Sequence, residues 1–253
     1  MITTDTVLIG ATFFSAGYAA SAKEDCLIVE RRSVVGAEFA AALIANAPHK
    51  PCGIFAEHLK ELGIIAPSGG LHIVPCSIEL GRFLLEQNIK LLLETEALSV
   101  TRSGDAFELT IFNRDGMQKI RATRFINTES MAASGAYRTL GAILVGGTAS
   151  ISLHEELGYI QYERSEEEPI FHLRLDEGDD IVSAKEKMRA VIDSGAYFGD
   201  WQIGAVASEI AWHYEYPTIV TLPDGRVSAP SSSFMDIISA MEGGASYAAS
   251  NDR

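Results

Sequence analysis

The chain has 253 residues, of which 47% are hydrophobic and 21% are charged, and it carries a formal net charge of −14 with a pI near 4.8. This size and balance exclude a mainly disordered chain and allow one large domain, or a core domain with a smaller lobe. The negative charge repels phosphate backbones and anionic lipid headgroups, so we expect neither nucleic acid nor a membrane as partner.

The first twenty residues are apolar but do not fit an export signal. Asp5 precedes the apolar run and no Lys or Arg occurs before Lys23, so the positively charged region of such a signal is missing. No uninterrupted apolar run reaches the ~20 residues that span a bilayer. The three cysteines are widely spaced and form no C-x-x-C motif, which favours reduced thiols and a cytoplasmic protein.

The N-terminal thirty residues predict a β-α-β unit. Residues 6–10, TVLIG, are β-branched or aliphatic and end in glycine, as in a buried parallel strand. Small residues at 15–23 predict a helix that packs closely on this strand. Residues 25–30, DCLIVE, predict the second buried strand.

The middle of the chain changes from a helical to a strand-like pattern. Three segments have helical spacing, the last with Ser77 as its N-cap: residues 36–47, 54–62 and 77–88. Three strand-like runs joined by tight-turn sequences follow: residues 89–102, 106–113 and 119–129. These runs predict an antiparallel meander whose last strand returns to the parallel sheet.

The C-terminal half mixes both patterns. Residues 137–147, YRTLGAILVGG, fit a helix or a buried strand, and periodicity does not decide between them. Residues 169–175 alternate like a strand and 180–194 form an amphipathic helix pattern. Residues 234–250 predict a closing helix, with the serines at 231–233 as its cap.

The first turn resembles a nucleotide-binding turn with two glycines replaced. The positions of G-x-G-x-x-G hold Gly10, Thr12 and Ser15. Glu30 follows Gly10 by twenty residues at the end of the second strand, where an acid bonds a ribose 2′-hydroxyl and repels a 2′-phosphate. A crossover with no ligand is the alternative, and Glu30 favours a bound nucleotide over it.

The order of these features along the chain resembles that of a known protein family. The turn, Glu30, the segment RRSVVG ending in Gly36, the meander and the return strand RFINTE are similar to FAD-dependent oxidoreductases of the glutathione-reductase-like fold. Residues 169–188 resemble the strand and helix of that family's substrate lobe. Residues 224–249 resemble its closing A-G-R-x-x-S-A segment and final helix.

The resemblance implies an α/β fold, in which a Rossmann-like FAD/NAD(P)-binding parallel sheet carries an antiparallel β-meander and a small α+β substrate lobe. Residues 1–134 and 216–253 would form the FAD-binding domain and 135–215 the lobe. The implied cofactor is FAD and the implied substrate a small organic molecule. The implied cofactor-binding residues are Gly10, Thr12, Phe14, Ser15, Glu30, Arg31, Gly36, Gly225, Arg226, Ser228 and Ala229.

Two departures leave the function open. The family's return strand ends D-A-T-G-D, whereas this chain has Asn127, Thr128, Glu129 and Ser130, and its substrate lobe is short. The alternatives are a divergent FAD site, a fold that has lost its cofactor, or a subunit that builds its site with a second protein or another copy of itself. A simple NAD-binding dehydrogenase fits less well, because it lacks the meander and the closing GRVSA segment.

Candidate catalytic groups are few. Glu38 follows Gly36 and would lie near a flavin in the family's geometry, while His172 and His213 titrate near neutral pH and are candidates for an acid or base. We expect no metal site, because neither Cys nor His shows paired ligand spacing.

Overall fold

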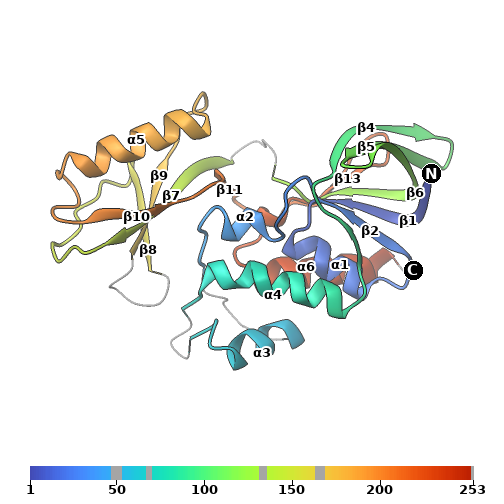
Figure 1. The fold of residues 1–253 in the computed structure, drawn as a ribbon, viewed down its shortest axis with the longest axis horizontal. Helices are drawn as coiled ribbons and strands as arrows, with labels where there is room; N and C mark the ends of the chain where they lie inside the picture. Colours follow the sequence, from blue (N-terminus) through green and yellow to red (C-terminus); the bar gives the residue numbers. More distant parts are fainter. Residues whose placement is uncertain (47–52, 67–69, 131–135, 163–168, 252–253) are drawn as a thin grey trace. The chain divides into compact units, whose positions relative to one another are not determined.

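The computed structural model describes residues 1–46, 53–66, 70–130, 136–162 and 169–251 (Figure 1). The chain forms two compact units: residues 1–37, 77–131 and 216–253 make the first, and residues 38–76 and 132–215 make the second. We expected residues 38–76 in the nucleotide-binding domain, but their contacts group them with the lobe.

The first unit contains the expected parallel sheet, extended by a meander, and the predicted fold class is confirmed (Figure 1). Its strands are β1 (Ile2–Ile9), β2 (Cys26–Val29), β3 (Lys90–Leu92), β4 (Glu96–Ser103), β5 (Ala106–Asn113), β6 (Gly116–Asn127), β12 (Val220–Thr221) and β13 (Val227–Ser228). The order is β12-β13-β6-β1-β2-β3, and β1 pairs in parallel with both β2 and β6. The return of β6 to the parallel sheet is therefore confirmed.

The first of the three strand-like runs is two strands, not one. Glu94 has φ of +50°, which ends β3 as a parallel partner of β2 and lets β4 begin the meander. The meander covers one face of the parallel sheet. The apolar residues that pack there are Val7, Ile9, Leu27, Val29, Phe107, Leu109, Ile111, Ile120, Ala122 and Phe125.

Two helix predictions need correction. The helix α4 (Ile73–Glu86) begins four residues before Ser77, so Ser77 is not its N-cap, and the Ser77 hydroxyl donates to the Val35 carbonyl instead. The predicted helix covers residues 36–47, of which the structure describes 36–46. Within that described part only α2 (Ala37–Ala40) is helical, and Leu43, with φ of +58°, lies in the turn that follows. The helix α3 (Ile54–Glu61) forms as predicted.

The second unit contains a five-stranded sheet. Its strands are β7 (Tyr137–Val145), β8 (Gly158–Tyr162), β9 (Pro169–Arg174), β10 (Gln202–Val206) and β11 (Ala211–His213). Residues 137–145 therefore form a strand, which settles the alternative that periodicity left open. The predicted helix α5 (Ile181–Asp193) is confirmed, and Asp180 caps it by accepting from the N–H groups of Val182 and Ser183.

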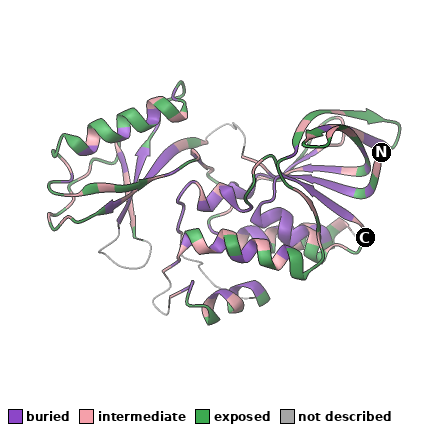
Figure 2. Ribbon diagram, viewed as in Figure 1, coloured by how far each residue is buried: buried purple, intermediate pink, exposed green. Residues whose placement is uncertain are grey.

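The helices α1 (Phe13–Ser21) and α6 (Ile237–Asn251) cross with their backbones in contact. A Cβ atom on Gly17 would lie 1.9 Å from the Met241 carbonyl oxygen, and one on Gly244 would lie 2.0 Å from the Phe14 carbonyl oxygen. Figure 2 shows α1 mainly in the colour of buried residues. The close crossing therefore requires glycine on both helices, since no Cβ fits at that distance.

We expect Gly17→Ala to destabilise the first unit by about 2–3 kcal/mol, because the new methyl group must push α6 away. The control is Gly81→Ala on α4, where the nearest atom to a new Cβ is a Val35 methyl at 3.7 Å. That variant should gain up to about 1 kcal/mol from helix propensity. Urea unfolding followed by far-ultraviolet circular dichroism measures both, and equal effects of the two variants would contradict the crossing.

Candidate functional site

The glycine turn joins β1 to α1 at the carboxyl edge of the parallel sheet. Gly10 has φ of +95°, and a Cβ atom there would lie 3.0 Å from both the Glu129 Cγ and the Thr128 Oγ1. Its N–H group donates to the Val29 carbonyl at 2.8 Å. Gly10 therefore serves a tight turn that Thr128 and Glu129, the two residues after β6, cover.

The N-terminus of α1 is capped by its own hydroxyl groups. The Thr12 Oγ1 accepts the Ser15 N–H at 3.1 Å, and the Ser15 Oγ accepts the Thr12 N–H at 2.8 Å, which is a complete capping box. The Ser231 Oγ accepts the Phe14 N–H at 3.2 Å. These are the N–H groups that face an anion when a helix N-terminus binds one.

Glu30 closes the same turn from the other side. Its Oε2 accepts the Ala11 N–H at 2.8 Å, and its Oε1 accepts the Arg32 N–H at 2.8 Å and the Arg32 guanidinium at 3.2 Å. The Glu30 side chain is only 2% exposed. The carboxylate that we expected at a ribose therefore bonds protein groups through both oxygens.

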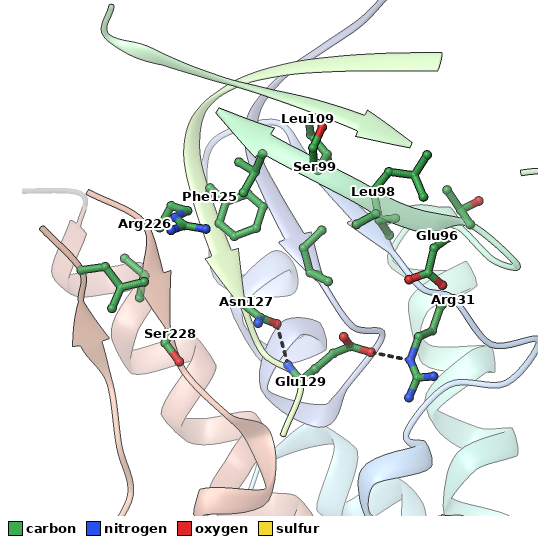
Figure 3. Close-up of a pocket in the computed structure, with 17 residues that line it drawn as sticks. Arg31, Glu96, Leu98, Ser99, Leu109, Phe125, Asn127, Glu129, Arg226 and Ser228 are labelled. Atoms are coloured by element: carbon green, nitrogen blue, oxygen red, sulfur yellow. Dashed lines mark hydrogen bonds and ion pairs between the residues drawn. The ribbon is translucent and has the colours of Figure 1, made fainter. Parts of the chain in front are cut away.

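The two residues that follow β6, Thr128 and Glu129, lie over the turn. The Thr12 hydroxyl donates to the Thr128 Oγ1 at 2.9 Å, and the Thr128 hydroxyl donates to the Ile9 carbonyl at 2.8 Å. The Glu129 carboxylate pairs with Arg31 at 3.2 Å (Figure 3). It also pairs with Arg32 at 3.3 Å. The Glu129 side chain thus occupies the space next to Gly10, where the pyrophosphate of a dinucleotide would pass.

The residues of this turn do not fit the pyrophosphate of FAD as they are arranged. The N–H groups of Gly10, Ala11, Thr12, Phe14 and Ser15 already have acceptors within the protein. The side chains of Thr12, Ser15 and Thr128 are buried, with exposures of 4%, 0% and 0%. The two phenylalanines are not the obstacle. The Phe14 ring packs against Phe234 and Tyr247, and Phe13 packs beside Gly36, so both side chains point into the core.

The remaining glycines of the expected site have structural roles. Gly36 has φ of +66° and donates its N–H to the Ala11 carbonyl at 2.7 Å, while a Cβ on it would meet the Phe13 ring at 2.8 Å. Gly225, with φ of +88°, forms the turn between β12 and β13. Ala229 donates its N–H to the Asn127 carbonyl at 2.8 Å and continues the pairing of β13 with β6.

The closing helix is also capped internally. Asp236 accepts the N–H groups of Ile238 and Ser239, each at 2.9 Å, and is 1% exposed. Residues Ser231–Ser233 form a short 3-10 helix before it. We expected those serines as the cap of α6, and the cap is Asp236 instead.

A cavity of about 620 Å³ opens at the carboxyl edge, between the parallel strands and the meander (Figure 3). Apolar side chains form its wall: Ile9, Val29, Ala97, Leu98, Val100, Leu109, Phe125, Leu222 and Val227. Its polar lining includes Arg31, Asn127, Glu129, Arg226 and Ser228. The volume suits a small organic molecule, and three residues of the expected site, Arg31, Arg226 and Ser228, meet there.

The second unit brings together the two histidines that the sequence singled out. The Thr139 Oγ1 lies 2.8 Å from the His213 Nε2 and 3.5 Å from the His172 Nδ1. Burial lowers the pKa of His172 to about 3, with a further contribution from His213, and burial lowers the pKa of His213 to about 4. Glu38 lies in the first turn of α2 in the same unit.

The structure shows no metal site in the part of the chain that it describes, because no three or more His, Cys, Asp or Glu side chains there are arranged to hold a metal ion. No helix in the described part of the chain is long and apolar enough to cross a membrane.

No protein-family model and no curated protein matches the chain. Solved structures do. A geranylgeranyl bacteriochlorophyll reductase-like protein from Thermoplasma acidophilum is 14% identical with a TM-score of 0.65, over 98% of this chain and 78% of that one. Glycine oxidase from Geobacillus kaustophilus is 11% identical with a TM-score of 0.65, over 96% and 93%.

A third similar structure, the myxobacterial chondrochloren halogenase CndH, is described as a variant of FAD-dependent halogenases. It is 12% identical with a TM-score of 0.62, over 98% of this chain and 73% of that one. The fold is that of FAD-binding flavoproteins. The fold is thus shared with flavoproteins of several activities, while the turn differs from the glycine-rich sequence typical of such folds at Thr12 and Ser15.

We expect the second unit to lose stability as the pH falls from about 6.5 towards 4. His172 and His213 have a lowered pKa in the folded chain, so the unfolded chain binds more protons in that window and each histidine costs up to about 1.4 kcal/mol per pH unit. Both tryptophans, Trp201 and Trp212, lie in this unit, so tryptophan fluorescence during urea unfolding measures the effect.

The matched variants for this measurement are His213→Gln and His154→Gln. The first should reduce the pH dependence, whereas the second, on an exposed side chain, should leave it unchanged. A free energy of unfolding that does not change between pH 7 and pH 5 would contradict the burial of neutral histidines.

Proposed function

We propose that this chain is a protein of the flavoprotein fold that functions without FAD at its glycine turn. In this proposal it binds a small organic molecule in the carboxyl-edge cavity, alone or as a subunit of a larger assembly. One observation carries the proposal: the N–H groups of Gly10, Ala11, Thr12, Phe14 and Ser15 all have acceptors within the protein.

Binding of a pyrophosphate at the N-terminus of α1 would cost free energy, because these contacts would have to break. A pyrophosphate at α1 would have to replace the capping hydroxyls of Thr12 and Ser15, and a displaced buried polar group costs about 1–3 kcal/mol unless it finds a new partner. The ligand would also meet the Glu129 side chain, which occupies the space beside Gly10. A ligand confined to the cavity avoids both costs, since it needs none of the turn's N–H groups.

The residues that line the cavity indicate the polarity of the ligand that would fit it. The wall is apolar, and the two guanidinium groups in the lining are already paired, Arg31 with Glu129 and Arg226 with Asp224. Those pairs neutralise each other's charge, so the site favours a mainly apolar molecule with one polar end over a multiply charged one.

FAD-dependent oxidation or reduction of a small organic substrate is the second candidate function. The likeness to flavoprotein structures favours it, and so does the position of Glu30 at the end of β2. It requires the capping box of Thr12 and Ser15 to open when FAD binds. The two candidates therefore differ in one measurable property, the affinity for FAD.

We expect the purified protein to be colourless and to leave FAD fluorescence unchanged in a titration. The triple variant T12G/S15G/E129G removes the capping hydroxyls and the carboxylate, so its affinity for FAD should rise roughly tenfold or more. Absorbance in the blue and near ultraviolet and quenching of flavin fluorescence measure both. A yellow wild-type protein, or tight FAD binding after reconstitution, would replace the first proposal with the second.

A separate experiment tests the cavity. We expect the fluorescent probe 8-anilinonaphthalene-1-sulfonate, an aromatic body with one polar end, to bind the folded protein. Leu98→Trp places a large ring at the cavity wall and should weaken binding roughly tenfold. Leu85→Trp, at an exposed position of α4 outside the cavity lining, is the control and should leave the affinity unchanged. Equal effects of the two variants would locate the probe elsewhere.

A further inference from the structure

Four strands of the second unit bring a set of polar and aromatic side chains to one face of its sheet. The register pairs His172 of β9 with Tyr159 of β8 and with Gly141 of β7. On the other side of β7, His213 of β11 pairs with Tyr137. Since side chains alternate along a strand, Phe171 and Leu173 point to the opposite face of the sheet from His172.

A series of hydrogen bonds runs through this cluster from Gln161 to His213. The donor and the acceptor of each bond can be identified by starting at Gln161. The Gln161 Oε1 accepts the Ala45 backbone N–H at 3.0 Å, which identifies this atom as the oxygen. The Gln161 Nε2 donates to the Asn46 Oδ1. The His172 Nε2 lies 3.1 Å from the same Gln161 oxygen, so this nitrogen carries the proton and donates it.

The donor and acceptor roles at His172 fix those of the next hydrogen bonds, because a neutral imidazole has one donor nitrogen and one acceptor nitrogen. With its proton on Nε2, His172 accepts at Nδ1, so the Thr139 hydroxyl donates to it across 3.5 Å. The Thr139 Oγ1 then accepts from the His213 Nε2 at 2.8 Å. This leaves the lone pair of His213 on Nδ1.

Nδ1 of His213 is an open acceptor. Among the described residues it has no hydrogen-bond partner, it is not an enclosed atom, and the His213 side chain is partly exposed. Burial of the ring keeps the pKa of His213 near 4, so the ring is neutral at pH 7 and its Nδ1 lone pair accepts a hydrogen bond.

Aromatic groups surround this acceptor. The Tyr137 ring stacks on His213 with 4.7 Å between centroids, and the Tyr159 ring meets it edge-on at 6.0 Å. The Arg174 guanidinium lies 4.8 Å from the centre of the Tyr137 ring. Such a setting suits an aromatic ligand, because rings stack well against rings.

We propose that this face of the second unit binds a phenol, whose hydroxyl group donates to the Nδ1 of His213. A neutral acceptor recognises a donor and has no proton to offer to an anion, so a phenol fits better than an aromatic carboxylate. Thr139 is the positioning residue, since it fixes which nitrogen of His213 accepts. The proposal adds a site to the one in the first unit and does not depend on the cavity or on FAD.

The first experiment measures the tautomers. Nitrogen-15 NMR of the histidine side chains should show the proton of His172 and of His213 on Nε2 at pH 7. Thr139→Val should let His213 exchange between both tautomers, while Thr139→Ser should keep the wild-type signal. A proton on Nδ1 of His213 in the wild-type protein would overturn the proposal.

The second experiment measures binding with phenol, anisole and benzoate as probes, through the chemical shifts of His213. Phenol should bind, and anisole, which lacks the donor, should bind roughly tenfold more weakly. Thr139→Val should weaken phenol binding and Thr139→Ser should restore it. Equal binding of phenol and anisole, preferred binding of benzoate, or no shift with phenol would each overturn the proposal, whether or not the first unit binds FAD.

Discussion

The N–H groups at the start of α1 must be satisfied by some acceptor, and this requirement organises the carboxyl edge of the first unit. In a dinucleotide-binding protein of this fold the pyrophosphate supplies the acceptor. Here Thr12, Ser15 and Ser231 supply it, and Glu30 does the same for Ala11. The turn, the return strand and the closing segment are therefore held together by their own side chains.

The second unit meets a similar requirement by different means. Its sheet buries His172 completely, and a buried imidazole must find partners for both ring nitrogens while it stays neutral. Gln161 and Thr139 provide them, and the resulting chain ends at the partly exposed His213. The hydrogen bonds that satisfy the buried His172 therefore also determine which nitrogen of His213 is the acceptor.

Most of the fold was predictable from the sequence because its signals are local. The apolar run of β1, the spacing from Gly10 to Glu30 and the period of residues 180–194 each identify an element without reference to the rest of the chain. The start of α4, the break at Glu94 and the cap of α6 were not predictable. Each depends on a tertiary contact or on one residue's φ angle, such as the bond from Ser77 to Val35.

The candidate site was predictable only in part, for the same physical reason. The sequence identified Thr12, Ser15 and Glu30, but whether they bond a ligand or one another depends on Thr128, 116 residues after Thr12 along the chain. Spacing also could not show that Thr139 lies between His172 and His213, because three different strands carry them. Polar groups that satisfy each other across such distances leave no local pattern.

Capping of this turn and its affinity for a dinucleotide are physically linked. A turn that merely lost its ligand would leave several N–H groups without acceptors, at about 1–3 kcal/mol for each buried one. The hydroxyls of Thr12, Ser15 and Ser231 remove that cost, and each takes up space or donors that a pyrophosphate needs. Because the same atoms cannot do both, the stability of this turn and its affinity for a dinucleotide oppose each other. The apolar core of the first unit, from Val7 to Phe125, includes none of these capping residues.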